Sequence, residues 1–251
     1  MLLSIENVHR RYALPRTHLF RAPPVIPAVQ GISLTLDRGE ILGIVGESGS
    51  GKSTLARMVM GFERPDRGRV WLNGQDSATL PRAARRQTQM VFQDPYDSLD
   101  PRRSIGWSVA EPLLATSMTT TERHARAADR LARVGLSPAD MARYPHEFSG
   151  GQRQRIAIAR AIAPDPALLV ADEPVAALDV SVQAQVLNLL MDLNRTMGLA
   201  MLFISHDLAV VASIADRIAV MQHGRIVETG PTAQIVAAPE HPYTQALFAA
   251  A

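Results

Sequence analysis

Three short apolar segments are the clearest pattern along the chain, at residues 41–45, 167–171 and 199–204. Each is continuous, and each is too short for a typical helix. This combination favours strands that are buried on both faces, as in a parallel sheet. A glycine-rich stretch follows the first segment, so a strand, a loop and then a helix are expected there.

Apolar residues at helical spacing predict the helices between these strands. One helix is expected from Lys52 to Gly61. Its apolar face consists of Leu55, Val59 and Phe62. A second helix, before the third apolar segment, would be capped by Ser181 and end at Gly198. Its apolar face consists of Val182, Val186, Leu189, Leu190 and Leu193. The alternation of strands and helices predicts an α/β core with helical crossovers.

The middle of the chain, from about residue 94 to 155, contains no convincing buried strand and is predicted to be a helical insert. Thr119 and Glu122 form the pattern of a capping box, which marks a helix N-terminus. That helix carries a row of basic residues, which we interpret as a solvated face: Arg123, Arg126, Arg130 and Arg133. The proline-rich segment Leu14–Pro27 is expected to be an exposed loop between the first two strands.

The composition of the chain excludes several kinds of site and partner. The 251 residues include no cysteine, which excludes disulfides, thiolate metal sites and iron–sulfur clusters and fits a reducing compartment. The net charge is only +2 and the basic residues are scattered, so no nucleic-acid partner is expected. The N-terminus lacks a signal-peptide pattern, and no apolar run reaches the roughly 20 residues that span a bilayer. We therefore expect a soluble protein whose membrane role would depend on a partner.

Gly46, Gly51, Lys52 and Ser53 match the P-loop pattern Gly-x-x-x-x-Gly-Lys-Ser in full. In this pattern the backbone N–H groups surround phosphates, the lysine contacts the β- and γ-phosphates, and the serine hydroxyl binds Mg²⁺. Lys52 is the only lysine in the chain; the other 25 basic residues are arginine. A planar guanidinium would fit poorly at this position. The sequence therefore predicts that the chain binds ATP with Mg²⁺.

Two acidic residues follow the second apolar segment. Asp172 and Glu173 would lie at the carboxyl end of a parallel strand, where α/β sheets bind their ligands. We interpret Asp172 as a magnesium ligand and Glu173 as the residue that polarises the attacking water. His206 follows the third apolar segment and is expected at the same edge, near the γ-phosphate. These residues together predict ATP hydrolysis.

Ser149-Gly150-Gly151-Gln152 precedes another predicted helix, Arg153–Ala163, and resembles a second phosphate-binding helix start without a lysine. One nucleotide does not need two such sites in one chain. This mismatch indicates that a second subunit completes the site.

The order and spacing of these motifs, together with Gln93 and Asp179, resemble the ATP-binding-cassette (ABC) family over nearly the whole chain. The resemblance implies that Ser149–Gln152 is the signature motif, which contacts the γ-phosphate held by the opposite subunit. Gln93 would sense Mg²⁺ and the attacking water, Asp179 would lie in a loop that communicates across the dimer, and Tyr12, just after the first strand, would stack on adenine.

The implied nucleotide-binding residues are Tyr12, Gly46, Glu47, Ser48, Gly49, Ser50, Gly51, Lys52, Ser53, Thr54, Ser149, Gly150, Gly151, Gln152 and Asp179. The implied catalytic residues are Lys52, Gln93, Glu173 and His206, and the implied magnesium ligands are Ser53, Gln93 and Asp172.

The resemblance also implies a single ABC ATPase domain over residues 1–251. Its P-loop NTPase core, with a parallel sheet and an N-terminal antiparallel β subdomain, would comprise residues 1–92 and 157–230. An α-helical subdomain would be inserted at residues 93–156, and residues 231–251 would form a C-terminal extension.

Finer features are similar to the dipeptide, oligopeptide and nickel importer subfamily. They are Gln93–Arg102, His241–Leu247 and the long loop after the first strand, which is more like the second of the two ATPase subunits. Phe148 and Ala177 stand where leucine and serine are commoner, without loss of a catalytic position. The C-terminal cysteine motif of some members is absent.

The subfamily implies an ATPase subunit at the cytoplasmic face of a bacterial inner membrane. Its partners would be a second ABC ATPase subunit, identical or different, transmembrane permease subunits and, indirectly, an extracytoplasmic solute-binding protein. The solute would be a dipeptide, an oligopeptide or a related solute such as nickel. The alternatives are the accessory ATPase of a phosphonate carbon–phosphorus lyase complex and other non-transport ABC ATPases. DNA-repair members carry long insertions, whereas Ser53 and Ser149 are only 96 positions apart here.

Overall fold

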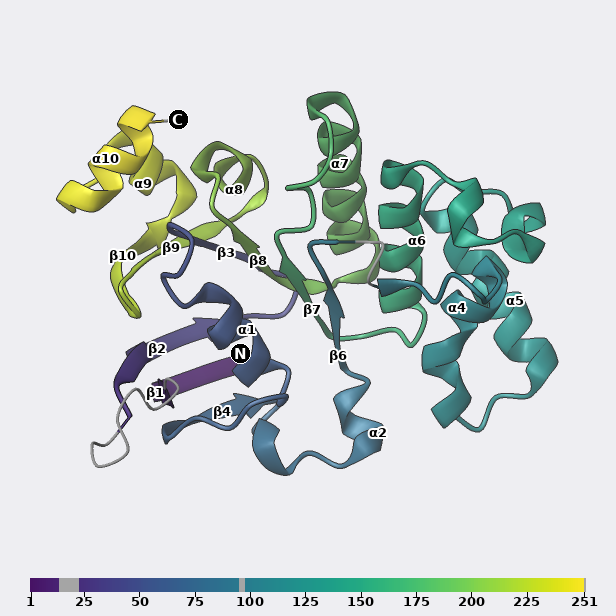
Figure 1. Cartoon of the computed structure of the whole chain (residues 1–251), viewed down its shortest axis with the longest axis horizontal. Helices are drawn as coiled ribbons and strands as arrows, with labels where there is room; N and C mark the ends of the chain where they lie inside the picture. The colour runs from purple at the N-terminus through teal and green to yellow at the C-terminus, as the bar shows by residue number, and fades with distance from the viewer. Residues whose placement is uncertain (14–22, 95–97, 251) are drawn as a thin grey trace. The chain divides into compact units, whose positions relative to one another are not determined.

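The computed structural model describes residues 1–13, 23–94 and 98–250, which group into two compact units (Figure 1). Unit 1 comprises Met1–Leu80 and Leu202–Ala251, and unit 2 comprises Pro81–Met201. This division differs from the expected subdomains because strands β6 (Thr88–Val91) and β7 (Leu168–Asp172) and helix α7 (Val180–Met197) group with the helices of the middle segment.

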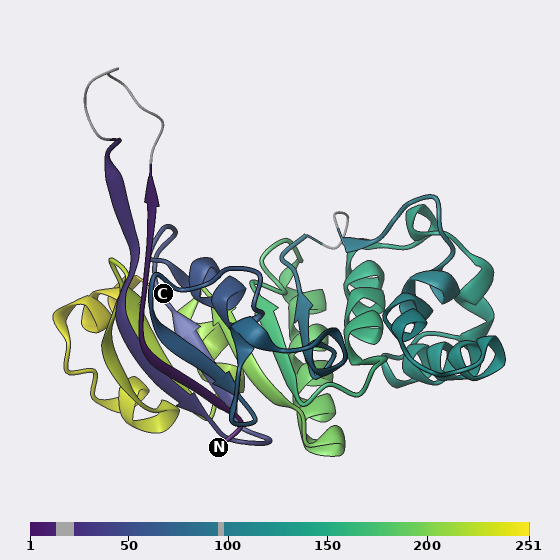
Figure 2. The same cartoon turned by 90° about the horizontal axis from the view of Figure 1, so that it is seen from below.

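An antiparallel sheet forms the N-terminal part of unit 1, as the resemblance implied. Its strands lie in the order β2 (Val25–Leu36), β1 (Leu3–Ala13), β4 (Arg67–Leu72) and β5 (Gln75–Asp76). Figure 2 shows β1 and β2 side by side along their length. Strand β2 includes Val25–Pro27, so the expected loop from Leu14 to Pro27 was too long, and its residues 14–22 lie outside the described residues. Tyr12 likewise lies within β1 rather than after it.

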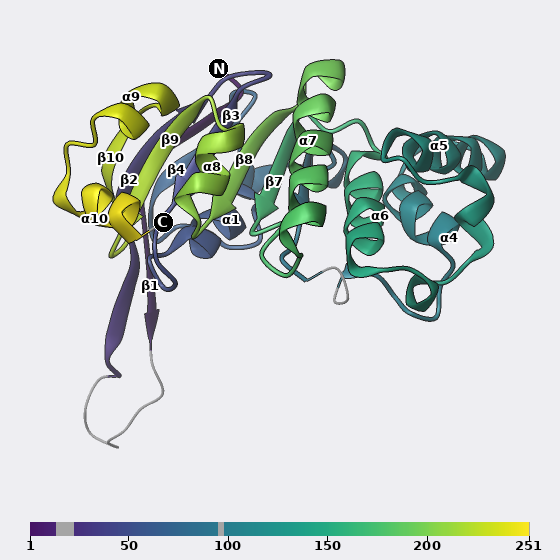
Figure 3. The same cartoon turned by 90° about the horizontal axis from the view of Figure 1, so that it is seen from above.

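The strand that leads into the glycine-rich segment belongs to a second sheet. Strand β3 (Ile41–Val45) pairs in parallel with β9 (Arg217–Gln222), and β10 (Arg225–Pro231) pairs antiparallel with β9. Every residue of β3 is buried, as the apolar pattern predicted. Figure 3 shows α8 (Leu208–Ile214) against β3 and α9 (Thr232–Ala237) beside β10. The last helix is α10 (Pro242–Ala250).

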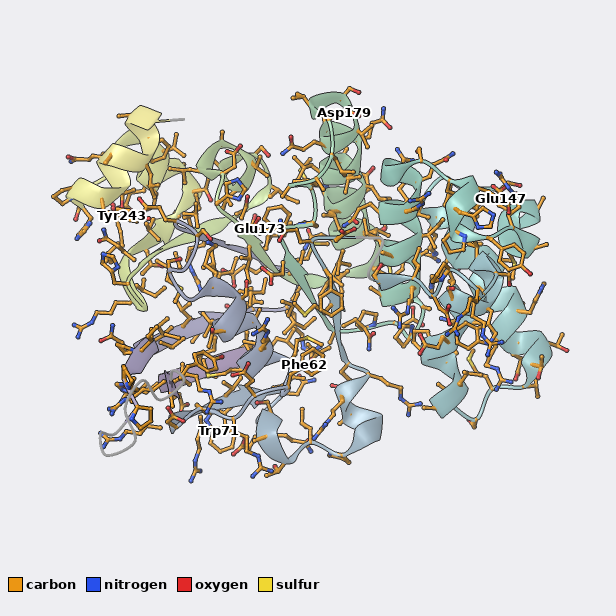
Figure 4. All side chains as sticks on the ribbon, viewed as in Figure 1. Phe62, Trp71, Glu147, Glu173, Asp179 and Tyr243 are labelled. Carbon is orange, nitrogen blue, oxygen red and sulfur yellow. The ribbon has the colours of Figure 1, made fainter. Side chains whose placement is uncertain are left out.

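Helix α1 (Lys52–Val59) follows the glycine-rich loop. Leu55 and Val59 are buried as predicted, but Phe62 is 60% exposed (Figure 4). The prediction for Phe62 was wrong because the helix ends at Val59. Gly61 then takes a left-handed turn with φ +69°, which carries Phe62 off the buried face.

In the larger sheet, unit 1 contributes strands in the order β10-β9-β3-β8, and unit 2 contributes the neighbouring pair β7-β6. Its remaining strands are β8 (Ala200–Ser205), β7 (Leu168–Asp172) and β6 (Thr88–Val91), and β6 pairs in parallel with β7 within unit 2. The three strands expected from the apolar segments are confirmed. They shift by at most one residue at an end.

Helices dominate the middle of unit 2. The longer ones are α4 (Ile105–Ala110), α5 (Thr120–Arg133) and α6 (Gly150–Ile162), which pack against one another. The shorter helical segments are α2 (Arg82–Arg85), Glu111–Ala115, Pro138–Ala142 and Pro145–Glu147. No strand is assigned to the described residues between 94 and 155, so the helical insert is confirmed there. In the described part of the chain no helix is long and apolar enough to cross a membrane.

Of the predicted helix caps, the capping box of Thr119 and the end at Gly198 are confirmed, and the N-cap at Ser181 is wrong. The capping box of Thr119 and Glu122 is present with both of its hydrogen bonds. Helix α7 (Val180–Met197) ends at Gly198 in the left-handed conformation, as predicted. Its N-cap, however, is Asp179 and not Ser181, since the Asp179 carboxylate accepts a hydrogen bond from the Val182 N–H. An N-cap aspartate satisfies an N–H group that the first turn cannot pair.

The row of arginines on α5 is not uniformly solvated. The side chain of Arg130 is only 4% exposed and donates to the carboxylates of Asp129 and Asp165. Arg126 also pairs with Asp165. Burial lowers the pKa of the Arg130 guanidinium, while the nearby carboxylate of Asp165 opposes that shift. The interpretation as a solvated face was therefore wrong for Arg130, which links α5 to the segment after α6.

Helices α6 and α7 approach each other closely at their N-termini. A Cβ atom added at Gly151 would lie 2.3 Å from Cγ1 of Val182, whereas one added at Gly150 would find its nearest neighbour, Cδ2 of Leu178, at 3.9 Å. The backbone at Gly151 can therefore approach α7 only because this residue has no side chain.

We expect Gly151→Ala to lower the free energy of unfolding by about 1–3 kcal/mol, because the new methyl group overpacks the contact with Val182. Gly150→Ala is the matched control and should leave stability unchanged or raise it by up to about 1 kcal/mol, since alanine favours a helix over glycine. Denaturant unfolding of the two variants measures the difference. Equal stabilities would contradict the close approach of α6 and α7.

Candidate functional site

The loop between β3 and α1 is shaped by glycines that other backbone atoms nearly touch. A Cβ atom at Gly46 would lie 2.1 Å from the carbonyl oxygen of Met221, and one at Gly51 would lie 2.2 Å from that of Ala28. Gly51 also has φ +106°, which residues with a side chain rarely adopt. Only glycine fits at either position, so the P-loop pattern has a steric cause in this fold.

The loop closes around the ammonium group of Lys52. This side chain is only 5% exposed, and its Nζ donates to the carbonyl oxygens of Gly46 at 2.7 Å and Glu47 at 2.9 Å. Ser50 is also buried, and its hydroxyl has no hydrogen-bond partner among the described residues. A buried positive charge and the first turn of α1, whose N–H groups point out of the helix end, are chemically suited to phosphate. The residues present therefore fit the phosphates of a nucleotide.

Residues from the C-terminal part of the chain form hydrogen bonds with the backbone of the P-loop. The N–H of Gly224, in the turn between β9 and β10, donates to the carbonyl of Ser50 at 2.9 Å. The N–H of Glu47 donates to the hydroxyl of Tyr243 on α10 at 3.0 Å. From the sequence, the segment that contains Tyr243 is only a subfamily feature. No local pattern could have revealed these contacts, since they join residues more than 170 positions apart.

Tyr12 lies beside the helix that follows the P-loop. Its hydroxyl donates to Oε2 of Glu63 at 2.5 Å and lies 3.5 Å from Oγ1 of Thr54. The guanidinium of Arg10 lies 5.1 Å from the centre of the Tyr12 ring. Unit 1 therefore brings Tyr12 close to the P-loop helix. His206, also in unit 1, is exposed directly after β8.

In unit 2 the parallel pairing of β6 and β7 aligns the predicted catalytic residues. The register pairs Val91 with Ala171, so Gln93 and Glu173 follow the same edge of the sheet, two residues beyond this pair. Glu173, which is labelled in Figure 4, follows β7 directly. Its φ of +49° is a left-handed conformation that is uncommon for a non-glycine residue. Backbone strain of this kind is frequent at functional sites. Asp172 and Glu173 are both half-buried, while Gln93 is exposed.

Among the described residues no group of three or more His, Cys, Asp or Glu side chains could hold a metal ion by itself. Mg²⁺ commonly binds through one or two protein ligands plus substrate phosphates. The hydroxyl of Ser53 and the carboxylate of Asp172 are the donor types that such a shared site needs.

The signature residues form the start of α6, which begins at Gly150 and not at Arg153. Ser149 caps this helix: the N–H of Gln152 donates to its hydroxyl at 3.4 Å, and the N–H of Ser149 donates to Oε1 of Gln152 at 3.0 Å. Phe148, just before them, is buried beneath the guanidinium of Arg143. The phenylalanine thus fills an apolar position where leucine is commoner.

Asp179 lies at the start of α7 (Figure 4), between Leu178, which is near Gly150, and Val182, which is near Gly151. Its carboxylate accepts from the N–H of Val182 at 2.9 Å and the hydroxyl of Ser181 at 2.8 Å. These hydrogen bonds lower the pKa of Asp179. Unit 2 therefore places the signature turn and Asp179 at two helix starts that touch through Gly151 and Val182.

Sequence comparisons assign these features to one family. The "ABC transporter" family model matches residues 29–176. The probable peptide ABC transporter ATP-binding protein y4tS of Sinorhizobium fredii is 52% identical, over 100% of this chain and 72% of that protein. The dipeptide transport ATP-binding protein DppF of Escherichia coli K12 is 48% identical, over 99% of this chain and 76% of that protein.

Solved structures agree with this assignment. The ATP-binding cassette MJ0796, in a dimeric post-hydrolysis state bound to ADP and Pi, is 28% identical with a TM-score of 0.79 and covers 92% of this chain and 99% of its own. The cbiO1 protein of Clostridium perfringens, part of the ABC transporter complex cbiONQ, is 26% identical with a TM-score of 0.81 and covers 94% and 91%. The chain belongs to the ABC transporter family and is an ABC-type ATPase.

Proposed function

We propose that this ATPase energises a bacterial importer for dipeptides, oligopeptides or a closely related solute. The observation that carries the proposal is the identity of 48–52% along the whole chain with ATP-binding proteins named for peptide and dipeptide transport. The segments Gln93–Arg102 and His241–Leu247, which resemble the peptide importer subfamily, support the same solute class.

In this proposal the P-loop binds the phosphates of ATP. The backbone N–H groups of residues 46–54 surround them, and Lys52 places its charge on the β- and γ-phosphates. Tyr12 stacks on adenine and is held in place by Glu63. The residues that would hold Mg²⁺ are Ser53, Asp172 and Gln93. When bound, the ion neutralises charge on the phosphate oxygens.

Glu173 is proposed to accept a hydrogen bond from the attacking water and to polarise it. Its position after β7, on the same edge as Gln93, supports this role, as does its left-handed backbone. Gln93 would orient the same water, and His206 would contact the γ-phosphate.

The proposed site is completed by a second cassette. Ser149, Gly150 and Gly151 would contact the γ-phosphate bound to the partner, which supplies stabilisation that one chain lacks. The dimeric state of the MJ0796 structure supports such an arrangement. The partner would be a second copy or a related ATPase subunit, with Asp179 in the communicating loop.

The membrane partner is proposed to contact the helical part of unit 2. The large apolar side chains exposed there include Trp107, at 39%, and Leu114, at 53%. Contact with a membrane subunit would remove these apolar side chains from water. The chain would then sit at the cytoplasmic face of the inner membrane, bound to permease subunits that receive the solute from an extracytoplasmic binding protein.

We expect Glu173→Gln to keep ATP affinity but to lower kcat by about 100- to 10,000-fold, since glutamine cannot polarise the water. Lys52→Ala should instead abolish tight ATP binding. Equilibrium binding of a fluorescent ATP analogue and single-turnover hydrolysis separate the two effects. Unchanged turnover in Glu173→Gln would place the catalytic base elsewhere, with His206 next to be tested.

The shared site predicts that ATP brings two chains together. The Glu173→Gln chain should dimerise in ATP and not in ADP, as measured by light scattering. Adding Ser149→Asp should prevent dimerisation, because this change keeps the helix cap but places a negative charge against the γ-phosphate. Ser149→Asn keeps the cap without the charge and is the control. A dilute wild-type chain that hydrolyses ATP at a specific rate independent of concentration would contradict the shared site.

The importer assignment is tested by purifying the native complex from its cell membrane and identifying the solute bound to its extracytoplasmic receptor. Because the chain has no cysteine, Leu114→Cys introduces a unique crosslinking site. We expect it to crosslink to a membrane subunit. Val236→Cys, at a side chain that is 45% exposed in unit 1, is the control and should not. Co-purification with soluble phosphonate-cleaving enzymes instead would contradict the proposal.

A further inference from the structure

The C-terminal motif His241–Leu247 has no assigned role in ATP hydrolysis, yet it contacts the P-loop. The hydroxyl of Tyr243 accepts the N–H of Glu47 at 3.0 Å. Both residues belong to unit 1. Tyr243 lies in the first turn of α10 and is half-buried (Figure 4). Partial burial raises the pKa of its phenol above the ordinary value.

The contact falls on one particular peptide plane. The N–H that Tyr243 binds belongs to the peptide bond between Gly46 and Glu47, and the carbonyl of that same bond accepts from Nζ of Lys52 at 2.7 Å. A peptide bond is planar and, when trans, directs its N–H and C=O in opposite directions. Holding the N–H at Tyr243 therefore keeps the carbonyl turned towards Lys52.

Tyr243 is itself held in place by β10. The carboxylate of Glu228 accepts from the N–H groups of Glu240 and His241 at 2.8 and 3.1 Å. Nδ1 of His241 then accepts from the N–H of Tyr243 at 3.2 Å, at the start of α10. Burial acts to raise the pKa of Glu228, but its hydrogen bonds outweigh burial and leave that pKa below its usual value. The tyrosine is thus carried on a segment anchored to the sheet.

We propose that Tyr243 is a positioning residue of the nucleotide site, which orients the Gly46–Glu47 peptide and, through it, the ammonium group of Lys52. The C-terminal helix then sets the affinity of the P-loop for ATP. The inference rests on the proposed role of the P-loop in binding ATP. It adds a residue about 190 positions away along the chain to that site.

Tyr243→Phe removes one oxygen atom and keeps the ring, so the fold should survive. We expect the KM for ATP to rise by about 2- to 10-fold, the value of one hydrogen bond, with kcat nearly unchanged. Hydrogen exchange followed by mass spectrometry should show faster exchange in the peptide that covers residues 44–52, and the melting temperature should stay within error of the wild type. Tyr144→Phe, at a side chain that is 43% exposed in unit 2, is the matched control and should behave as the wild type.

Two results would overturn the proposal. One is a Tyr243→Phe chain whose P-loop exchange and KM both equal those of the wild type. The other is a raised KM together with a lower melting temperature and faster exchange throughout unit 1, which would show a general loss of stability. Failure of the P-loop assignment itself is recognised separately, as normal ATP affinity in Lys52→Ala.

Discussion

The nucleotide site depends on the hydrogen bonds that hold the buried ammonium group of Lys52. A charge this far from water is tolerated only when it is hydrogen-bonded, and here the carbonyl groups of Gly46 and Glu47 supply the acceptors. The loop must therefore turn both carbonyls inwards, which in turn directs its N–H groups elsewhere. Lysine meets this requirement with a compact head group, and the broad fork of arginine would not.

The close packing of the loop follows from the same constraint. Gly46 and Gly51 lie so near the carbonyl oxygens of Met221 and Ala28 that no side chain fits at either position. The turn between β9 and β10 adds a hydrogen bond from Gly224 to Ser50, and Tyr243 adds another to Glu47. The P-loop is thus held between β2, which precedes it in the chain, and the C-terminal elements. A change in β2 or in the C-terminal elements would therefore alter the loop that is proposed to bind the phosphates.

Several residues in unit 2 stabilise helix ends and, in our proposal, also take part in the nucleotide site. Gln152 closes the capping box of α6, and Asp179 caps α7. Both helix starts meet where Gly151 touches Val182. Replacing these residues would therefore disturb a helix end as well as any contact with a partner's ATP. For this reason the comparison of Ser149→Asp with Ser149→Asn, which both keep the cap, isolates the effect of charge.

The sequence by itself determined the α/β class, the three buried strands, the helical middle segment, the Thr119 capping box and the ABC family. These features depend on local periodicity, or on motifs whose spacing along the chain carries the information. Errors arose at element ends: Phe62 left the buried face because α1 stops at Val59, and Asp179 took the capping position expected for Ser181. The prediction that Arg130 is solvated was wrong, since its side chain is buried and pairs with Asp165, which lies outside its own helix. Only the tertiary structure decided that Met221, Gly224 and Tyr243 support the P-loop. Contacts between residues so far apart along the chain leave no local pattern, because they are set by the pairing of β9 with β3, by the turn between β9 and β10, and by the position of α10.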